Sequence, residues 1–182
     1  MDEFGGRWIE TYSGGKLHFL NPQPEEIQIT DIAHALSLTC RFGGQCKSFY
    51  SVAEHSIRVA EIVPPKYKLQ ALLHDASEAY LPDLPRPIKA KLPEFKSMEL
   101  IILYNIWLRF GISKILRGEK VIKGADNILL ATEARDLMSN MDNWAPLPEP
   151  LKEKILPWKS QEYVETVFLR KFDLYRDMLG IV

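Results

Sequence analysis

The sequence predicts an all-α protein with one short β-hairpin near its N-terminus. Most segments repeat apolar residues every three or four positions, which is typical of helices packed on a core, and prolines separate these segments. One early segment instead joins two β-prone runs through a Gly-Gly turn. The 182 residues suffice for one core. We therefore expect a single domain over 1–182, with the hairpin at 8–20 and a helical core at 30–179.

The first elements are predicted from turn and cap signals. The hairpin at 8–20 is expected because its two runs flank a Ser-Gly-Gly-Lys turn. A helix should follow, from an N-cap at Thr30–Asp31 to about Cys40. A capping-box sequence at 51–54 predicts the start of the next helix. Two consecutive prolines, beginning with Pro64, should end that helix.

The later elements are predicted from apolar periodicity and from the positions of prolines. A helix is expected over about 66–80. A stiff loop should follow over 81–87, because three prolines there remove backbone donors and fix φ. Longer helices are expected over 93–110, 119–141 and 161–179.

Composition argues against a polymeric or membrane partner. The net charge is -1, from 23 basic and 24 acidic residues, so no overall basic field attracts nucleic acid. The apolar run at 101–108 is too short to span a bilayer, and the first residues lack the basic start and apolar core of a signal peptide. We expect a cytoplasmic location. Cys40 and Cys46 lack the spacing of a zinc pair and are expected to be reduced thiols near the core.

The adjacent pair His74 and Asp75 is the strongest chemical signal. It lies in an apolar run at 71–78, and a buried imidazole beside a buried carboxylate is costly unless both are paired or bind a cation. A single helical histidine is more often a hydrogen-bonded core residue. However, His55 and Asp126 supply a second imidazole and a second carboxylate from other expected helices. These four residues are our candidate ligands for a divalent ion.

The ordered ligand set and its flanking sequences resemble the HD superfamily of metal-dependent phosphohydrolases. The flanks are LLHDASE at 72–78 and DLPRPIK at 83–89, and they are similar to the HD-domain 5'-deoxynucleotidases and small dNTP triphosphohydrolases, including phage enzymes that hydrolyse dATP. The resemblance implies an HD-domain helical bundle and a homodimer. The mixed nitrogen and oxygen ligands suit manganese, cobalt, iron, zinc or magnesium, with a second ion left open.

The resemblance also implies roles around the ion. Glu78 and Asp83 are expected to be catalytic, Arg41 to contact phosphate, and Phe42 to contact the nucleoside where the family usually has tryptophan. Lys89 is a second candidate for phosphate binding. The alternatives are an exposed helix carboxylate for Glu78, a turn residue for Asp83 and a solvated side chain for Lys89. We expect neither Arg41 nor Glu78 to lie in the packed core.

The function expected from this set is hydrolysis of the 5'-phosphate of deoxynucleoside monophosphates. One alternative is a triphosphohydrolase acting on dNTPs, for example dATP. A further alternative is a non-catalytic nucleotide sensor on an HD scaffold, although such proteins typically lose a ligand. The substrate in every case is a small nucleotide.

Overall fold

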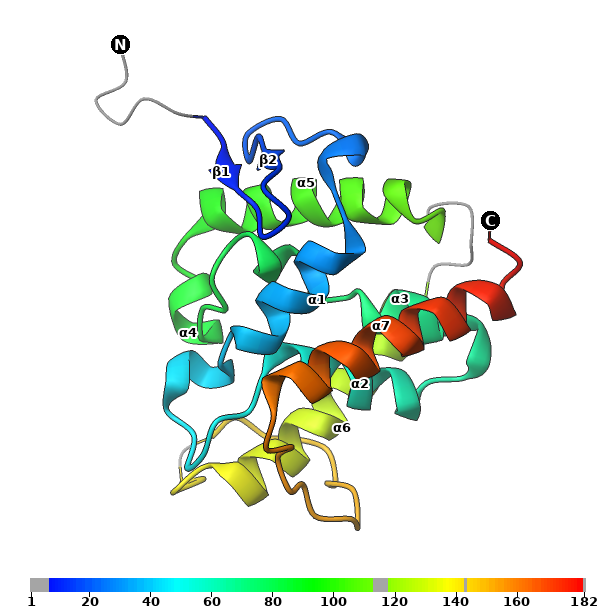
Figure 1. The fold of residues 1–182 in the computed structure, drawn as a ribbon. Coiled ribbons are helices and arrows are strands. Elements are labelled where there is room, and N and C mark those ends of the chain that lie inside the picture. The colour runs from blue at the N-terminus through cyan, green and yellow to red at the C-terminus, as the bar shows by residue number, and fades with distance from the viewer. Residues whose placement is uncertain (1–6, 113–117, 143, 182) are drawn as a thin grey trace.

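The hairpin near the N-terminus consists of two antiparallel strands, β1 (Ile9–Glu10) and β2 (Lys16–Leu17). The computed structural model describes residues 7–112, 118–142 and 144–181, and the hairpin begins this range (Figure 1). The turn uses Gly14 at φ 80°, a value that favours glycine. The hairpin is expected over residues 8–20, and both paired strands lie within that range, although each strand has only two residues.

Helices make up most of the described chain, so the all-α fold class is confirmed. The α-helices are α1 (Ile29–Leu38), α2 (Val52–Ile62), α3 (Lys68–Leu72), α4 (Arg86–Lys89), α5 (Pro93–Arg109), α6 (Glu119–Leu137) and α7 (Gln161–Met178). Four short 3-10 helices separate them: η1 (Pro24–Glu26), η2 (Arg41–Gly44), η3 (Pro65–Tyr67) and η4 (Ala76–Ala79). None of the described helices is both long and apolar enough to cross a membrane.

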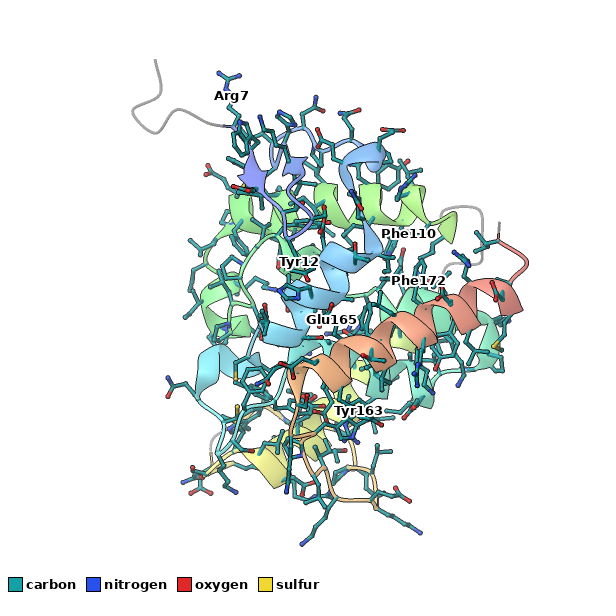
Figure 2. All side chains as sticks on the ribbon, in the orientation of Figure 1. Arg7, Tyr12, Phe110, Tyr163, Glu165 and Phe172 are labelled. Carbon is teal, nitrogen blue, oxygen red and sulfur yellow. The ribbon has the colours of Figure 1, made fainter. Side chains whose placement is uncertain are left out.

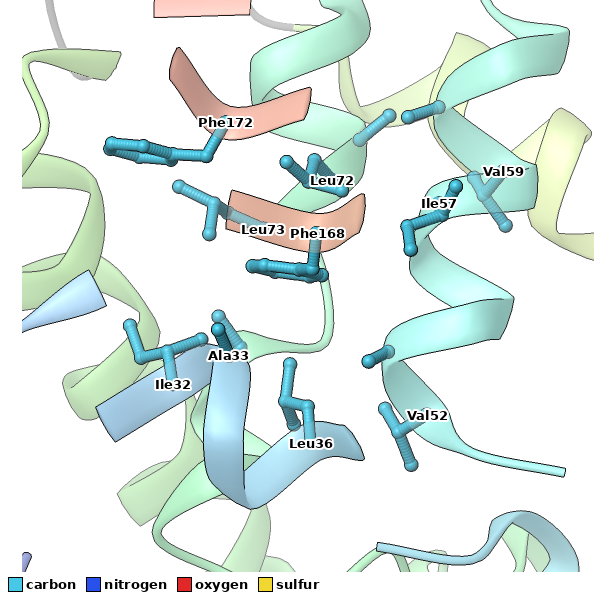
Figure 3. Close-up of a cluster of buried hydrophobic side chains, with 14 of the residues drawn as sticks. Ile32, Ala33, Leu36, Val52, Ile57, Val59, Leu72, Leu73, Phe168 and Phe172 are labelled. Carbon is cyan, nitrogen blue, oxygen red and sulfur yellow. The ribbon is translucent and has the colours of Figure 1, made fainter. Parts of the chain in front are cut away.

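The core lies where α7 crosses α1, α2 and α3 (Figure 1). Phe168 of α7 is fully buried between these helices, and Phe172 lies one turn further along the same face (Figure 3). The side chains that surround them come from α1, α2 and the end of α3: Ile32, Ala33, Leu36, Val52, Ile57, Val59, Leu72 and Leu73. This packing fixes α2 and α3 against each other, and both lead to the candidate site.

The starts of α1 and α2 differ in how well the sequence predicts them. Ser51 caps α2 as expected, because its Oγ accepts a hydrogen bond from the Glu54 backbone N at 3.1 Å. The reciprocal half of the capping box is absent, since the Glu54 carboxylate accepts from Arg58 instead. The expected N-cap at Thr30–Asp31 is wrong: α1 begins at Ile29, and Asp31 accepts hydrogen bonds from the N and Oγ of Ser13 in the hairpin.

The continuous helix expected over 66–80 is wrong. α3 ends at Leu72, and a turn over 73–75 leads into η4. Asp75 has φ -105° and ψ 16°, outside the helical region, and its carbonyl accepts from the Glu78 backbone N at 3.0 Å in a tighter three-residue turn. His74 and Asp75 are therefore presented from a turn rather than from a helix face.

The remaining helices follow the sequence prediction more closely. α5 and α7 match the expected ranges to within one residue. α6 ends at Leu137, four residues before the expected end, and α4 begins inside the segment expected to be a loop. Pro87 stands in the first turn of α4, where a missing backbone donor costs nothing.

Candidate metal centre

Four side chains converge from three parts of the fold. His55 comes from α2, His74 and Asp75 come from the turn after α3, and Asp126 comes from α6. The Nε2 atom of His55 lies 3.4 Å from His74 Nε2, 3.6 Å from Asp75 Oδ2 and 3.4 Å from Asp126 Oδ1. His74 Nε2 lies 3.3 Å from Asp75 Oδ2. The structure thus brings His55, His74 and Asp75 together as one mutually close group, and it places Asp126 against His55 at the edge of that group.

These separations fit a shared cation. Ligand bonds of about 2.1 Å place two donors about 3.0 Å apart at a right angle and about 3.4 Å apart at a tetrahedral angle. The donor separations of 3.3 to 3.6 Å are close to these values. His55, His74 and Asp75 form a group that can hold a metal ion.

The partners of the two imidazoles direct both Nε2 atoms toward the cluster. His74 Nδ1 lies 2.7 Å from the carbonyl oxygen of Ala71, which can only accept, so Nδ1 carries the proton. His55 Nδ1 lies 2.6 Å from Glu133 Oε1 and donates in the same way. When both rings are neutral, their Nε2 lone pairs face each other at 3.4 Å and repel. A cation bound between the two nitrogens would remove this repulsion.

The charges around the cluster favour a positive charge at this position. Burial and Arg41 lower the pKa of His55, but Glu133 and Asp126 outweigh them and raise it to about 9. Burial raises the pKa of Asp126, yet hydrogen bonding and charge from His55, with His74 and Lys123, hold it well below its usual range. In the absence of a metal ion, a proton on His55 therefore offsets the carboxylates.

Glu133 is a buried residue of the site that the sequence analysis missed. It lies on α6, is fully buried, and accepts from His55 through Oε1 and from Arg41 Nη2 through Oε2, the latter at 3.2 Å. It therefore links a candidate ligand to the candidate phosphate-binding arginine. The signal that could have revealed it is a charged residue on the apolar face of a helix, two turns beyond Asp126.

Arg41 lies beside the cluster. Its Nη1 is 3.5 Å from Asp75 Oδ2, its Nε is buried without a hydrogen-bond partner in the described chain, and its guanidinium lies 5.3 Å from the ring of Phe42. Phe42 has φ 58°, in the left-handed region. Only 8% of Arg41 is exposed, so the expectation that it lies outside the packed core is wrong.

Glu78 is buried with an incomplete set of partners. It is 7% exposed, which rules out both the exposed-carboxylate alternative and the expectation that it lies outside the core. Its Oε1 accepts from Lys89 Nζ at 3.1 Å, and its Oε2 is buried with no partner among the described residues. Burial, together with Asp75 and Asp83, raises the pKa of Glu78 to about 9.

Lys89 and Asp83 take different positions around Glu78. Lys89 Nζ also donates to Glu99 Oε1 at 2.7 Å, so its charge is held between two carboxylates, and a solvated side chain is excluded. Asp83 is half-buried, and its negative charge acts on both Arg41 and Glu78. The catalytic role of Asp83 and the phosphate-binding role of Lys89 stay predictions.

Two exposed cations, also missed by the sequence analysis, reach the outer side of Asp126. Arg86 Nη2 and Lys123 Nζ donate to Asp126 Oδ2 at 2.9 and 2.7 Å, whereas Oδ1 faces His55. Their side chains are 53% and 58% exposed. They place positive charge at the solvent edge of the cluster.

The two remaining histidines lie elsewhere. His34 Nδ1 lies 3.0 Å from Glu165 Oε2 and its ring stacks on Tyr12, so it connects α1, α7 and the hairpin. Figure 2 labels these two partners, Tyr12 in the hairpin and Glu165 on α7. Two alternatives for His34, lining the pocket or bonding a core carbonyl, are not seen among the described residues, where its contacts are to Glu165 and Tyr12. His18 pairs with Glu26 at the surface, as expected for a hairpin residue.

The chain has relatives in two bacteria. No family model matches it. The protein YfdR of Escherichia coli K12, named as uncharacterized, is 39% identical over 142 residues, which cover 78% of this chain and 79% of YfdR. An uncharacterized protein of Rhodobacter capsulatus is 35% identical over 142 residues, covering 71% of this chain and 72% of its own length. The chain therefore belongs to the same family as YfdR.

Proposed function

We propose that this protein is a metal-dependent nucleotide phosphohydrolase of the HD type, which releases the 5'-phosphate from deoxynucleoside monophosphates. The observation that supports this most is the cluster of two imidazoles and two carboxylates. The buried Arg41 lies beside Asp75, and the buried Glu78 stands in the short helix that follows Asp75. Hydrolysis of a phosphate ester uses each of these groups. His55, His74, Asp75 and Asp126 would hold the ion.

Each group has a part in this chemistry. A bound divalent ion polarises the phosphoryl group and lowers the pKa of water. Arg41 keeps its Nε free of partners in the described chain and provides a donor for a phosphate oxygen. Glu78 has a buried Oε2 without a partner among the described residues, which suits a group that hydrogen-bonds water and moves its proton. Lys89 holds the other oxygen and fixes the carboxylate plane.

The nucleoside is proposed to contact Phe42. Arg41 and Phe42 are adjacent, so a phosphate on the arginine brings its sugar and base toward the ring. Trp144 lies edge-on to Phe42 with ring centroids 6.5 Å apart, and it lines a cavity of about 300 Å³ with Met141 and Leu147. This aromatic and apolar surface suits a base or a deoxyribose.

A dNTP is the second candidate substrate, and one observation favours it. Arg86 and Lys123 are exposed and converge on Asp126 Oδ2 at the solvent edge. A triphosphate carries more negative charge than a monophosphate, and these two cations could pair with the phosphates beyond the metal ion.

The test is a panel of dNMPs and dNTPs assayed with manganese, cobalt, iron, zinc and magnesium. Phosphate release from dNMPs supports the proposal, whereas release of tripolyphosphate from dNTPs replaces it with the second candidate. Asp126→Asn is the control, because it removes a ligand carboxylate and should abolish either activity. Nucleotide binding without hydrolysis by the metal-loaded protein would instead identify a non-catalytic sensor.

We also propose a homodimer in the cytoplasm that has no nucleic-acid polymer as partner. The support for the dimer is an exposed apolar stripe on α5 formed by Leu100, Tyr104 and Leu108, which are 58%, 56% and 39% exposed. Residues four positions apart share one helix face, so the three side chains form a continuous strip. Sizing chromatography and cell fractionation test assembly and location.

A further inference from the structure

The only two cysteines of the chain stand at the two ends of the turn that carries Arg41 and Phe42. The Sγ atoms of Cys40 and Cys46 lie 3.8 Å apart, close to van der Waals contact. Cys46 Sγ also lies 3.8 Å from the carbonyl oxygen of Arg41. Both cysteines are half-buried, so small reagents in water can reach them.

The backbone around this turn holds the two thiols together. Phe42, Gly43 and Gly44 all have positive φ, at 58°, 59° and 79°, which reverses the chain direction within a few residues. The Arg41 backbone N donates to the Tyr50 carbonyl at 2.9 Å, and the Lys47 backbone N donates to the Leu137 carbonyl at 2.8 Å. Each cysteine is therefore adjacent to a residue whose backbone is anchored to the body of the protein.

We propose that Cys40 and Cys46 form a reversible disulfide that closes the turn bearing Arg41. A disulfide places its sulfurs about 2.05 Å apart, so the two Sγ atoms must approach by about 1.8 Å, which is within reach of side-chain rotation. The bond would join residues on either side of the turn, and it would replace the thiol contact to the Arg41 carbonyl.

The oxidant is a low-molecular-weight disulfide of the glutathione class. One cysteine thiolate attacks a sulfur of this disulfide, breaks its S–S bond, forms a mixed disulfide and releases one small thiolate. The second cysteine thiolate then attacks the sulfur of the first cysteine in this mixed disulfide, forms the Cys40–Cys46 bond and releases the second small thiolate. The two protons of the cysteine thiols pass to the two released thiolates. The protein loses two hydrogen atoms, and the small disulfide is reduced.

The consequence for Arg41 rests on the proposed function, whereas the disulfide itself does not. Arg41 follows Cys40 directly, and its guanidinium contacts Glu133 and Asp75 at 3.2 and 3.5 Å. Closing the bond takes the Cys46 thiol away from the Arg41 carbonyl, and we infer that the turn then adjusts and shifts the guanidinium relative to these partners. If Arg41 binds phosphate, the oxidised protein should have a higher KM than the reduced protein.

The disulfide is tested on the full-length protein equilibrated with oxidised and reduced glutathione at several ratios. Free thiols are then trapped with N-ethylmaleimide and counted by mass spectrometry. Two labels in the reduced protein should fall to none in the oxidised protein, with no glutathione attached and with a cross-linked peptide joining Cys40 to Cys46. Cys40→Ser and Cys46→Ser are matched controls and should instead carry one glutathione. Two labels, or two bound glutathiones, after equilibration with oxidised glutathione alone would overturn the proposal.

The effect on Arg41 is tested by kinetics with the nucleotide that the substrate panel identifies. The KM of the fully oxidised protein should rise several-fold and return after reduction by a phosphine. It should stay constant under the same treatment in the double variant Cys40→Ser, Cys46→Ser, which has no thiol to oxidise or to bind glutathione. An unchanged KM in a fully cross-linked protein would overturn the link to Arg41. Absence of any hydrolysis by the reduced, metal-loaded protein would instead refute the proposed function, and the thiol counts would still decide the disulfide.

Discussion

Glu133 should set the affinity of the site for metal although it is not itself a ligand. Its carboxylate accepts from His55 Nδ1 at 2.6 Å and from Arg41 Nη2 at 3.2 Å in a fully buried position. The first contact fixes the imidazole tautomer and directs Nε2 toward the cluster. Glu133→Gln keeps the size of the side chain but removes its charge, and its amide nitrogen must face either Arg41 or His55, both of which donate.

The size of the effect follows from the loss of this outer partner. Such losses typically weaken metal binding about 10-fold to 100-fold. At a metal concentration of about 100 times the wild-type Kd, the bound ion stabilises the wild-type fold by about 2.7 kcal/mol, and the variant by only about 1.4 to 0.4 kcal/mol. For a chain of this length, the metal-induced rise in Tm should therefore shrink by about 3 to 9 °C.

The assay combines calorimetric titration of the metal-free protein with thermal unfolding at fixed metal concentration. Glu54→Gln is the matched control, because Glu54 is also buried and adjoins His55 in α2, yet its carboxylate accepts from Arg58 and from the Trp158 backbone N. Both variants should unfold more easily without metal, but only Glu133→Gln should lose metal affinity. A folded Glu133→Gln protein with the wild-type Kd would refute the orienting role that we assign to Glu133.

Three further predictions address the other parts of the site and the assembly. Glu78→Gln should lower kcat by about 100-fold or more while metal content stays unchanged, because the carboxylate is assigned to proton transfer; turnover near wild type, with metal content verified, would remove Glu78 from the mechanism. Arg41→Ala should raise KM and, because it removes one of the two donors to the buried Glu133, should also lower the free energy of unfolding by about 1 to 3 kcal/mol in denaturant titrations. An unchanged KM in the folded variant would count against phosphate binding by Arg41. Tyr104→Glu on α5 should convert the proposed dimer to a monomer in sizing chromatography. Tyr163→Glu on α7 is the control and should leave the dimer intact, because this tyrosine is equally exposed, at 56%, but lies outside the α5 stripe. Loss of the dimer in the Tyr163 variant alone would place the interface on α7.

The sequence predicts long helices well where apolar periodicity and caps agree. α5 and α7 match because apolar spacing, with Pro93 at the start of α5 and Ser160 capping α7, points to the same boundaries. The break after α3 is different, because it depends on two competing sets of hydrogen bonds. His74 Nδ1 donates to the Ala71 carbonyl while the backbone tightens into three-residue turns. Periodicity cannot distinguish this arrangement from a continuous helix, because buried residues continue on both sides of the break.

The identity of the four clustered residues was predictable, but the reason that they suit a metal ion was not. A histidine and an aspartate in an apolar run already imply a partner, because burial of unpaired groups is costly. The sequence contains no information on which imidazole nitrogen faces the cluster. That depends on Ala71 and Glu133, which approach from α3 and α6 only after the helices have packed.

Glu133 shows how the argument used for His74 extends to residues outside any motif. It lies in the run Leu129 to Ala134, which is buried throughout, and a carboxylate there must have donors from neighbouring helices. Asp126 and Glu133 are seven positions apart, which corresponds to about two helical turns, so both carboxylates leave α6 on one side. A buried carboxylate two turns from a candidate ligand and on the same face is therefore itself a candidate partner of that site. Had this rule been applied to the sequence, it would have paired Glu133 with a histidine or an arginine of the cluster, and the structure contains both pairs.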